Sequence, residues 1–277
     1  MSTVILTPAE AAGSAGPTRS YALRDSMTML RRNLKHMQRY PSMTISIVAM
    51  PILMLLLFVY VFGGALGTGI GAGAERGDYI NYVVPGIILM SATAGAVATA
   101  VSVCTDMTEG IINRFRTMSI SRGSVLTGHV LGSVIQVAAV LVLVTGVSLA
   151  IGFRPDASPV EWIAALGLLL FLAFALGWLS VAMGMGAKTV EAASNAPMPL
   201  TFLPFLGSAI VTPDSMPAGL RWFAEYQPFT PVNETLRGLL LGTEIGNDGW
   251  IALAWCAGLG VLGYLWSRSV FNREVTR

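Results

Sequence analysis

The chain alternates long apolar runs with shorter segments that carry its charged residues. Six runs contain no Asp, Glu, Lys or Arg. They are residues 43–62, 83–103, 125–151, 162–185, 198–211 and 250–266. A helix of about 20 residues crosses the hydrocarbon core of a bilayer and satisfies its backbone hydrogen bonds internally. The pattern therefore predicts an all-α membrane protein with six transmembrane helices.

Two of these runs differ from an ordinary span. Residues 198–211 form the shortest run, which Pro197 precedes and Pro204 interrupts. Proline removes a backbone donor, so we expect this fifth span either to break or to extend into its flanks. The sixth run begins with Trp250 and ends with Trp266, as a helix anchored at both membrane interfaces does.

Composition supports the membrane class and excludes several others. Hydrophobic residues make up 54% of the chain and charged residues only 12%, against about 25% charged in soluble domains. A disordered chain, a nucleic-acid-binding protein and an ordinary cytosolic enzyme are excluded on this ground. Two cysteines and two histidines, widely spaced, predict neither a disulfide framework nor a metal site.

The distribution of basic residues predicts the orientation. Thirteen of the 17 Lys and Arg residues fall in the two tails and the second and fourth connecting segments. Cytoplasmic segments carry an excess of Lys and Arg, so both termini are expected in the cytoplasm, in a multi-pass plasma-membrane protein. Residues 1–19 predict a disordered tail without a signal peptide, and residues 269–277 a second cytoplasmic tail. The six-helix domain then covers 42–268.

Residues 20–41 predict an amphipathic helix before the first span. Leu23, Met27, Leu30, Leu34 and Met37 recur at helical spacing on one face. The opposite side carries basic residues, namely Arg24, Arg31, Lys35 and Arg39. Such a helix lies in the headgroup layer with its basic groups toward anionic lipid. A solvated basic tail is the alternative.

Residues 106–120 predict a second amphipathic helix, on the cytoplasmic side. Asp106 is a suitable N-cap, and Glu109 follows three residues later, as in a capping box. An apolar stripe follows, made of Met107, Ile111, Phe115 and Met118. Basic residues lie in the segment and directly after it, namely Arg114, Arg116 and Arg122. This helix either inserts into a groove of a soluble partner or packs on the bundle as an ordinary positive-inside loop.

The long outer segment, residues 212–249, predicts two short helices. Met216, Leu220 and Phe223 mark one, and the other starts with Thr230 as N-cap and ends at Gly242. A segment this apolar predicts a re-entrant hairpin over 213–245 that dips into the outer leaflet and is buried against protein. The alternative is a small extracellular cap.

Catalytic motifs are missing from the sequence. It has no HExxH and no GxSxG, and the phosphate-loop reading of residues 184–189 fails because Ala187 precedes Lys188 in place of glycine. The spans lack Asp, Glu, Lys and Arg and offer instead His129, Gln136, Cys256 and small hydroxyl side chains, which is atypical of ion-coupled carriers. The small residues of 91–100 suit close helix contacts. We therefore expect a protein that is not itself an enzyme and takes its energy from a partner.

Three stretches resemble the permease subunits of type-2 ABC exporters, especially the daunorubicin-resistance type. They are residues 106–118, residues 208–221, and the pairs Gln227-Pro228 and Leu236-Arg237. The resemblance covers nearly the whole chain after Ser20. Ser119 departs from the proline usual in that family and puts the local turn geometry in question.

The resemblance implies a dimer with a second permease copy or close homologue, and two copies of a separate ATPase subunit. ATP and Mg would lie on the ATPase, and this chain would bind no cofactor. ATPase coupling would fall to Asp106, Met107, Glu109, Gly110, Ile111, Arg114, Phe115, Arg116 and Met118. The resemblance also implies an outer hairpin, whose matching residues in this chain are Pro213, Pro217, Gln227, Pro228 and Arg237. Residues 20–41 would be the connecting helix, with Arg24, Arg31, Lys35 and Arg39 at the interface.

The sequence indicates the class of substrate only through the apolar character of the bundle. An apolar bundle suits export of a hydrophobic or amphiphilic drug or lipid. Two alternatives remain open: a permease for polysaccharide or glycolipid, and a membrane partner of an ATPase that moves no substrate. An intramembrane enzyme lacks the polar groups it would need.

Overall fold

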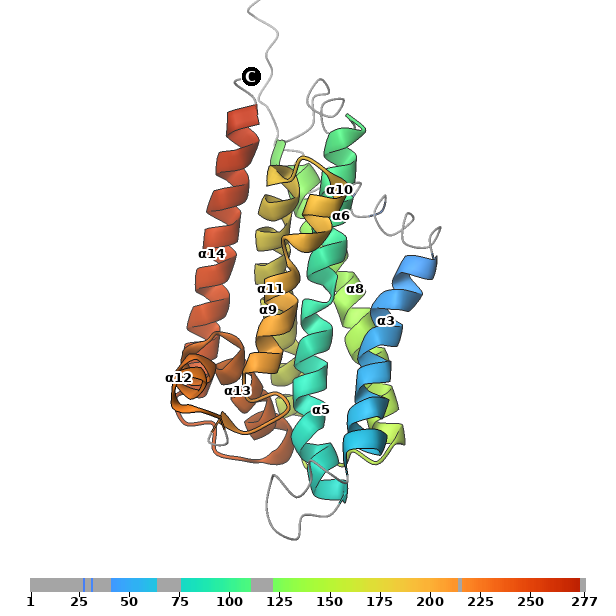
Figure 1. The fold of residues 1–277 in the computed structure, drawn as a ribbon, viewed down its shortest axis with the longest axis vertical. Coiled ribbons are helices and arrows are strands. Elements are labelled where there is room, and N and C mark those ends of the chain that lie inside the picture. The colour runs from blue at the N-terminus through green and yellow to red at the C-terminus, as the bar shows by residue number, and fades with distance from the viewer. Residues whose placement is uncertain are drawn as a thin grey trace, which may run out of the picture.

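The computed structural model describes residues 27, 31, 41–63, 76–110, 122–213 and 216–274. Within these ranges the chain is helical, with connecting turns and no strand (Figure 1). The first elements are α3 (Pro41–Leu56), the π-helix η1 (Leu57–Phe62), α5 (Arg76–Thr93), α6 (Gly95–Thr108), α8 (Arg122–Ala150) and α9 (Pro159–Gly186). Those that follow are α10 (Val190–Asn195), α11 (Met198–Phe202), the 3₁₀ helix η2 (Leu203–Leu206), α12 (Ala218–Tyr226), α13 (Phe229–Leu241) and α14 (Asp248–Glu274).

Four helical segments are long and apolar enough to cross a membrane. They are Gly77–Thr108, Val125–Ala150, Pro159–Gly186 and Asp248–Phe271, and a shorter apolar helix covers Ile47–Phe62. The first of the four joins α5 and α6 through a turn at Ala94. The all-α membrane class is thus confirmed, and these four segments contain or nearly coincide with the predicted spans 83–103, 125–151, 162–185 and 250–266.

The predicted fifth span, 198–211, is not one continuous α-helix. It consists of α11, the single 3₁₀ turn η2, and a run of turns over 207–210. Pro199 stands at the start of α11, and Pro204 at the start of η2. Because proline lacks the backbone donor that an α-helix interior needs, the chain breaks its helix at these positions. A span broken by its prolines was one of the two outcomes expected.

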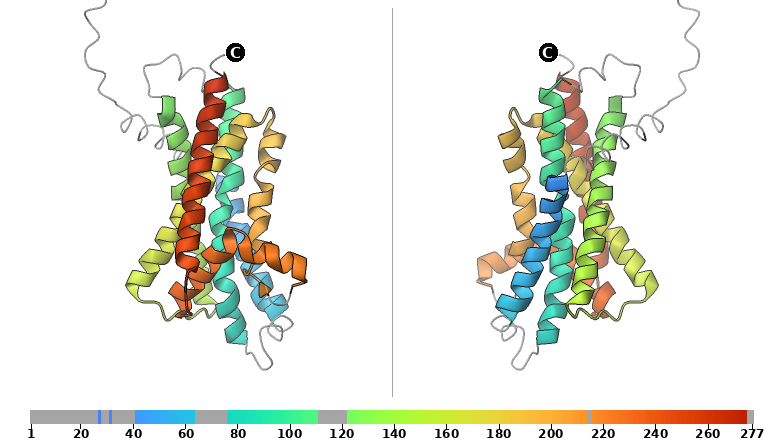
Figure 2. Two further views of the ribbon diagram at one scale, coloured as in Figure 1. Left: turned by 90° about the vertical axis from the view of Figure 1, so that its left-hand side faces the viewer. Right: turned by 90° about the vertical axis from the view of Figure 1, so that its right-hand side faces the viewer.

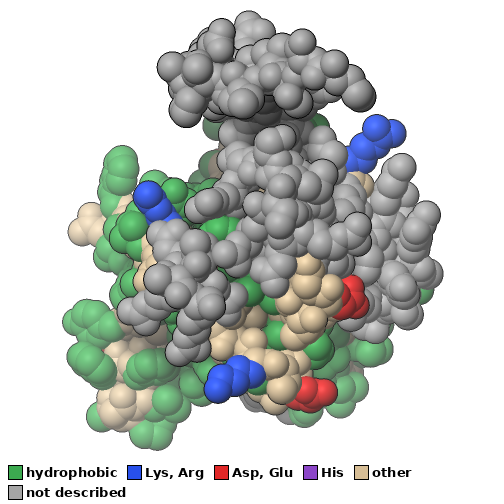
Figure 3. Space-filling view, turned by 90° about the horizontal axis from the view of Figure 1, so that it is seen from above, with side chains coloured by type: hydrophobic (Ala, Val, Ile, Leu, Met, Phe, Trp, Pro, Cys, Tyr) green, Lys and Arg blue, Asp and Glu red, His purple; other side chains and the backbone are tan. Residues whose placement is uncertain are grey.

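The long helices run side by side, and the two ends of the bundle differ (Figures 1 and 2). One end carries α12 and α13, which lie crosswise to the long helices. The opposite end carries α10 and the C-terminal end of α14. We call them the hairpin end and the tail end. Figure 3 looks onto the tail end and shows both basic and acidic side chains there.

Helix α9 forms the centre of the packing, because it contacts α5, α6, α8, α13 and α14. Small residues let these helices approach closely, as they do in membrane bundles. A Cβ added to Gly184 of α9 would overlap the backbone of Ala100 in α6. A Cβ on Gly263 of α14 would lie 2.6 Å from the backbone nitrogen of Leu179 in α9. Two of these helix contacts thus leave no room for even one methyl group.

A pair of glycines in the last turn of α9 tests this packing. Gly184→Ala places its methyl group against the backbone of Ala100 and is expected to destabilise the protein by roughly 1–3 kcal/mol, as overpacking does. Gly186→Ala is the control, because nothing lies within 4 Å of a Cβ at Gly186. The measurement is thermal unfolding of both variants in the same mild detergent. Equal melting temperatures would show that α6 and α9 do not touch as described.

Candidate functional site

A buried polar cluster lies at the hairpin end, where α13 meets α5 and the turns after η2. We call Tyr82, Ser208, Asn233, Glu234 and Arg237 the Arg237 cluster. Arg237 is only 6% exposed, and Asn233 only 1%. Asn233, Glu234 and Arg237 share one face of α13 because residues three and four apart are neighbours on a helix. Buried polar groups need hydrogen-bond partners, and the contacts of the cluster supply them, except that Oδ1 of Asn233 has none among the described residues.

The guanidinium of Arg237 joins three parts of the chain. Its Nη1 donates to Glu234 Oε1 at 2.7 Å, within α13. Its Nη2 donates to the carbonyl oxygen of Ser208 at 2.5 Å and to that of Tyr82 at 3.3 Å. The guanidinium carbon also lies 3.7 Å from the centre of the Tyr82 ring, a cation–π contact. One charged side chain thus fastens α13 both to α5 and to the turns after η2.

The carbonyl oxygen of Ser208 accepts two further hydrogen bonds. Tyr82 donates its hydroxyl at 3.2 Å, and Asn233 donates its side-chain nitrogen at 3.1 Å. Ser208 lies beyond the end of η2, where no following helical turn supplies a donor for its carbonyl. The three side chains replace the helical donors, so the cluster stabilises the break in the fifth apolar segment.

Helix α5 lies directly against the same turns. A Cβ on Gly86 would overlap the backbone of Ala209, which follows Ser208. Gly86 itself follows Pro85 within α5. The missing side chain at Gly86 therefore permits the close approach that brings Tyr82 onto the carbonyl oxygen of Ser208.

The corner between α12 and α13 contains two predicted hairpin residues. Gln227 is buried and caps the C-terminus of α12, and Pro228 is the N-cap of α13. The predicted N-cap role of Thr230 is wrong. Its hydroxyl donates instead to the carbonyl oxygen of Ala224 at 2.5 Å, and α13 already begins at Phe229. The hydroxyl of Thr230 therefore bonds to α12 and does not cap the N-terminus of α13.

The two short helices predicted for the hairpin are both present. Helix α12 covers Ala218–Tyr226 after Pro217, which is its N-cap. Helix α13 ends at Leu241, and Gly242 follows with a φ of 71°, a left-handed conformation that glycine adopts without strain. Pro213 lies in the turn before α12 and accepts the backbone N–H of Met216 at 3.0 Å.

At the tail end the structure corrects the prediction for Asp106. This residue does not begin a helix; it lies in the last turn of α6, which continues to Thr108. Its Oδ2 is 3.1 Å from Nε2 of His129 in α8, and both side chains are buried. The carboxylate thus pairs across two helices instead of capping one. Glu109 is exposed at the C-cap of α6, and Gly110 follows with a φ of 70°.

Other residues predicted for this end are only partly described. Met107 packs against an apolar cluster that contains Val103 and Trp178, and Arg31 is exposed on helical backbone. The remaining residues predicted here lie outside the described residues, namely Arg24, Lys35, Arg39, Ile111, Arg114, Phe115, Arg116 and Met118. The predicted helix over 20–41 falls almost wholly in the same undescribed part, and the predicted helix over 106–120 does so after Gly110.

Sequence analysis singled out Arg237 but missed its partners. A charged residue in an otherwise apolar helix signals that a partner exists, and Glu234 at helical spacing is a candidate. Tyr82 and Ser208 could not be found this way, because they are far away in sequence. The pairing of Asp106 with His129 has no sequence signal for the same reason.

The chemistry of these groups is structural and does not resemble a catalytic site. The hydrogen bonds of the Arg237 cluster go mainly to backbone carbonyls. Among the described residues, no group of three or more His, Cys, Asp or Glu side chains could hold a metal ion. What the geometry defines is a multi-pass helical membrane protein in which a short helical hairpin is locked to a broken apolar segment.

Comparison with known proteins identifies the family. Residues 25–241 match the model of the ABC-2 type transporter family, and the chain belongs to this family. Such chains are membrane permeases of ABC exporters, and the family in general works as dimers with an ABC ATPase partner.

Several curated relatives are permeases. A daunorubicin resistance ABC transporter permease protein, DrrB1 of Streptomyces coeruleorubidus, is 29% identical over 89% of this chain and 86% of its own. A probable doxorubicin resistance ABC transporter permease protein, DrrC of Mycobacterium tuberculosis, is 24% identical over 93% of this chain and 91% of its own. The inner membrane transport permease YadH of Escherichia coli is 24% identical over a stretch that covers 75% of this chain and 80% of YadH.

Two arginines of the hairpin allow a matched test of the Arg237 cluster. Arg237→Leu leaves the carbonyl oxygens of Ser208 and Tyr82 without this donor, and we expect a loss of roughly 1–3 kcal/mol of stability, as when buried polar groups lose a hydrogen-bond partner. Arg221 pairs with Glu225 at 2.7 Å, but both side chains are more than 40% exposed. Arg221→Leu should therefore cost about 0–1 kcal/mol.

Thermal unfolding in detergent measures both variants. Arg237→Lys adds a third point, since lysine keeps the charge but cannot form the forked contacts of a guanidinium, and it should lie between wild type and Arg237→Leu. If Arg237→Leu is as stable as Arg221→Leu, the cluster does not hold the hairpin in place.

Proposed function

We propose that this chain is the permease subunit of an ATP-driven exporter that moves a hydrophobic or amphiphilic substrate, a drug or a lipid, out of the cell. The observation that carries the proposal is the similarity to a daunorubicin resistance permease along most of both chains. The apolar helical bundle is consistent with it, because such a substrate can partition into the membrane before transport. In this proposal the chain binds no cofactor, and a separate ATPase holds ATP and Mg.

The proposed topology has six spans and both termini in the cytoplasm. The first span would be α3 with η1, and the fifth would be the broken segment of α11 and η2. The tail end would face the cytoplasm, which agrees with the exposed basic residues Arg31, Lys188 and Arg268 in its helices and turns. The hairpin end would then face outward. Residues 1–19 and 269–277 would be cytoplasmic tails, and residues 20–41 the interfacial connecting helix.

We propose that α12 and α13 form a re-entrant hairpin over 213–245. Helix α13 supports this because nearly all its residues are buried against the bundle. Helix α12 exposes large apolar side chains, with Trp222 at 65% and Tyr226 at 64%. Exposed aromatic residues of this kind suit the membrane interface, and a hairpin at that depth would be covered by lipid.

Coupling to the ATPase would run through residues 106–120. The undescribed segment 111–121 connects the end of α6 to the start of α8. The contact between Asp106 and His129 joins those two helices toward the ends that the segment connects. A force applied to the segment by an ATPase would therefore move α6 and α8 together. The apolar contact with the ATPase would come from Met107, Ile111, Phe115 and Met118. The register of the segment on the ATPase would be set by Glu109, Arg114 and Arg116.

The proposed transporter is an assembly of several chains. Two permease copies, or one copy and a close homologue, would work with two ATPase subunits. Closure of the ATPases on ATP would shift the two bundles and open a path outward. Substrate would enter sideways from the inner leaflet near the first and fifth segments, where Met50 of α3 and Phe202 of α11 are exposed.

A pull-down tests the partner and the coupling segment together. Tagged chain is purified in mild detergent from its native host, and we expect an ATPase subunit to co-elute in a near one-to-one ratio. Phe115→Ala combined with Arg114→Glu should abolish the co-elution, because it removes apolar contact and reverses a charge. Arg221→Glu is the control, since Arg221 lies in α12 at the opposite end of the bundle.

The eluate is then assayed for ATP hydrolysis alone and after adding daunorubicin, a phospholipid or a glycolipid. Stimulation by the drug supports export of an amphiphilic drug. ATPase activity that no drug, lipid or glycolipid stimulates would favour a membrane partner that moves no substrate. A chain that elutes alone, without ATPase activity, would contradict the proposal.

A second measurement separates binding from coupling. Arg114→Glu alone should leave the bundle folded and lower drug export relative to ATP hydrolysis. Arg221→Glu should leave that ratio at the wild-type value. Normal export by the Arg114→Glu variant would show that Arg114 has no role in coupling.

A further inference from the structure

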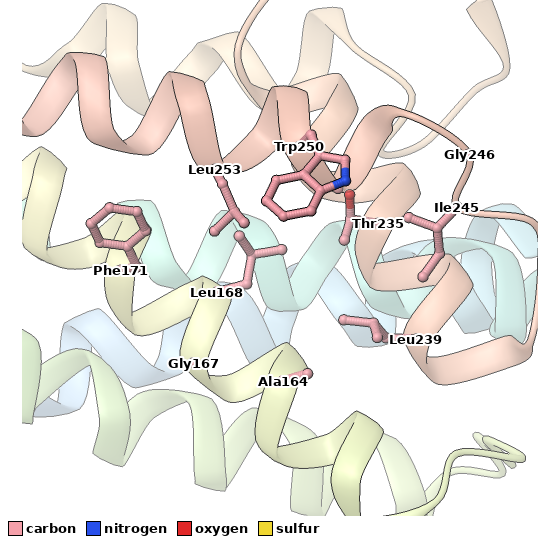
Figure 4. Close-up of a pocket in the computed structure, with 11 residues that line it drawn as sticks. Ala164, Gly167, Leu168, Phe171, Thr235, Leu239, Ile245, Gly246, Trp250 and Leu253 are labelled. Carbon is pink, nitrogen blue, oxygen red and sulfur yellow. The ribbon is translucent and has the colours of Figure 1, made fainter.

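An apolar pocket lies between α9, α13 and α14, apart from the Arg237 cluster and the tail end. Its volume is about 400 Å³. Figure 4 shows Leu168, Phe171, Trp250 and Leu253 around it, and Thr235 and Leu239 of α13 on its other side. This volume falls in the usual range of small-molecule sites, about 300–1,000 Å³.

Small residues create the hollow. Ala164 and Gly167 of α9 and Gly249 of α14 line it, and nothing lies within 4 Å of a Cβ built on Gly167. Elsewhere on α9, glycine allows a neighbouring helix to approach, as at Gly184. At Gly167 no neighbour takes the space. The pocket is therefore a gap in the helix packing that the protein's own side chains leave open.

The lining offers almost no polar partner to a ligand. None of the lining residues is charged, and the hydroxyl of Thr235 already donates to the carbonyl oxygen of Pro231 at 2.7 Å, within α13, so the indole N–H of Trp250 is the one other polar side-chain group in the lining. A ligand headgroup or a water cluster would find few hydrogen bonds here, whereas dry apolar cavities accept apolar ligands. The apolar side chains that line the pocket therefore favour a hydrocarbon ligand over a polar one.

The position of the pocket agrees with a lipid chain. Helix α9 starts at Pro159, and Ala164 to Phe171 lie about 8–18 Å along it, at 1.5 Å per residue. Half of a hydrocarbon core is about 15 Å thick. The polar capping box of Ser158 and Glu161 marks the start of α9, and Gly249 and Trp250 stand in the first turn of α14, so the pocket runs from the membrane interface to the depth of the acyl chains of one leaflet.

The pocket also continues a surface that faces the bilayer. Trp250 is 76% exposed, and Ile163 of α9 is 72% exposed. Because α9 and α14 are long apolar helices of a membrane protein, these exposed apolar side chains contact the lipid of the bilayer. A gap open to that surface loses packing contacts if it stays empty, and a hydrocarbon chain restores them.

We propose that this pocket is a binding site for one acyl chain of a membrane lipid. The bound chain fills the space between the α9–α14 pair and α13, so it supports the helix that carries Arg237. The assignment of this lipid to the outer leaflet rests on the proposed orientation; the site itself does not.

Photo-crosslinking tests the site without any transport assay. Purified full-length chain is placed in nanodiscs that contain phosphatidylcholine with a photoreactive diazirine on one acyl chain, irradiated, digested and mapped by mass spectrometry. We expect adducts concentrated on the stretches around Gly167 and Gly249. Adducts spread evenly over all exposed apolar positions of α9 and α14 would overturn the proposal.

Filling the pocket supplies the matched comparison. Gly167→Phe should abolish the concentrated adducts, because its ring occupies the hollow, and Ala164→Phe gives a second variant with the same expectation. Gly258→Phe is the control, since Gly258 is exposed on α14, has nothing within 4 Å of its Cβ and lies outside the pocket. Adducts that persist at wild-type yield in folded Gly167→Phe and Ala164→Phe chains would refute the site.

One further outcome would replace the lipid by another occupant. Loss of the adducts on adding daunorubicin would make the pocket a substrate site. Because this readout needs neither ATP hydrolysis nor export, failure of the lipid site and failure of the proposed exporter function are distinguishable.

Discussion

The hydrogen-bonding demand of one backbone carbonyl organises the hairpin end of this protein. Ser208 follows a helix that proline has already broken, in a part of the chain where apolar side chains exclude water. Its carbonyl oxygen takes donors from α5 and from two positions of α13. An unpaired group at that place would cost several kcal/mol in hydrocarbon. The break, the hairpin and α5 are therefore held together as one unit.

The bundle around this unit is held by close backbone contacts. Helix α9 touches α6 at Gly184 and α14 at Gly263, where no side chain intervenes. Lipid tails are as apolar as leucine, so contacts between helices in a membrane gain stability from close packing and hydrogen bonds. A permease that changes shape would keep such tight contacts as rigid bodies and move at its looser joints. The hollow at Gly167 is a gap in the packing of α9, α13 and α14.

The two ends of the bundle hold different polar contacts. At the hairpin end Arg237 binds several partners, and α13 is almost wholly buried. At the tail end the contact of Asp106 with His129 is one of those that join α6 and α8, the helices on either side of the proposed coupling segment. Because these two helices pack together, displacement of one would be passed to the other. This arrangement is consistent with the proposal that the permease is driven from its tail end.

What the sequence determined by itself was the membrane class, four of the apolar spans and the two hairpin helices; at the fifth run its prolines left a break and an extension as alternatives. These follow from local properties, because a run of residues without charge, a proline or a terminal glycine acts on its own segment. The tertiary structure alone decided that Asp106 pairs with His129, that Thr230 bonds to Ala224, and that Tyr82 and Arg237 meet at Ser208. Each joins residues from different helices, and only the packing of those helices determines which polar groups become neighbours.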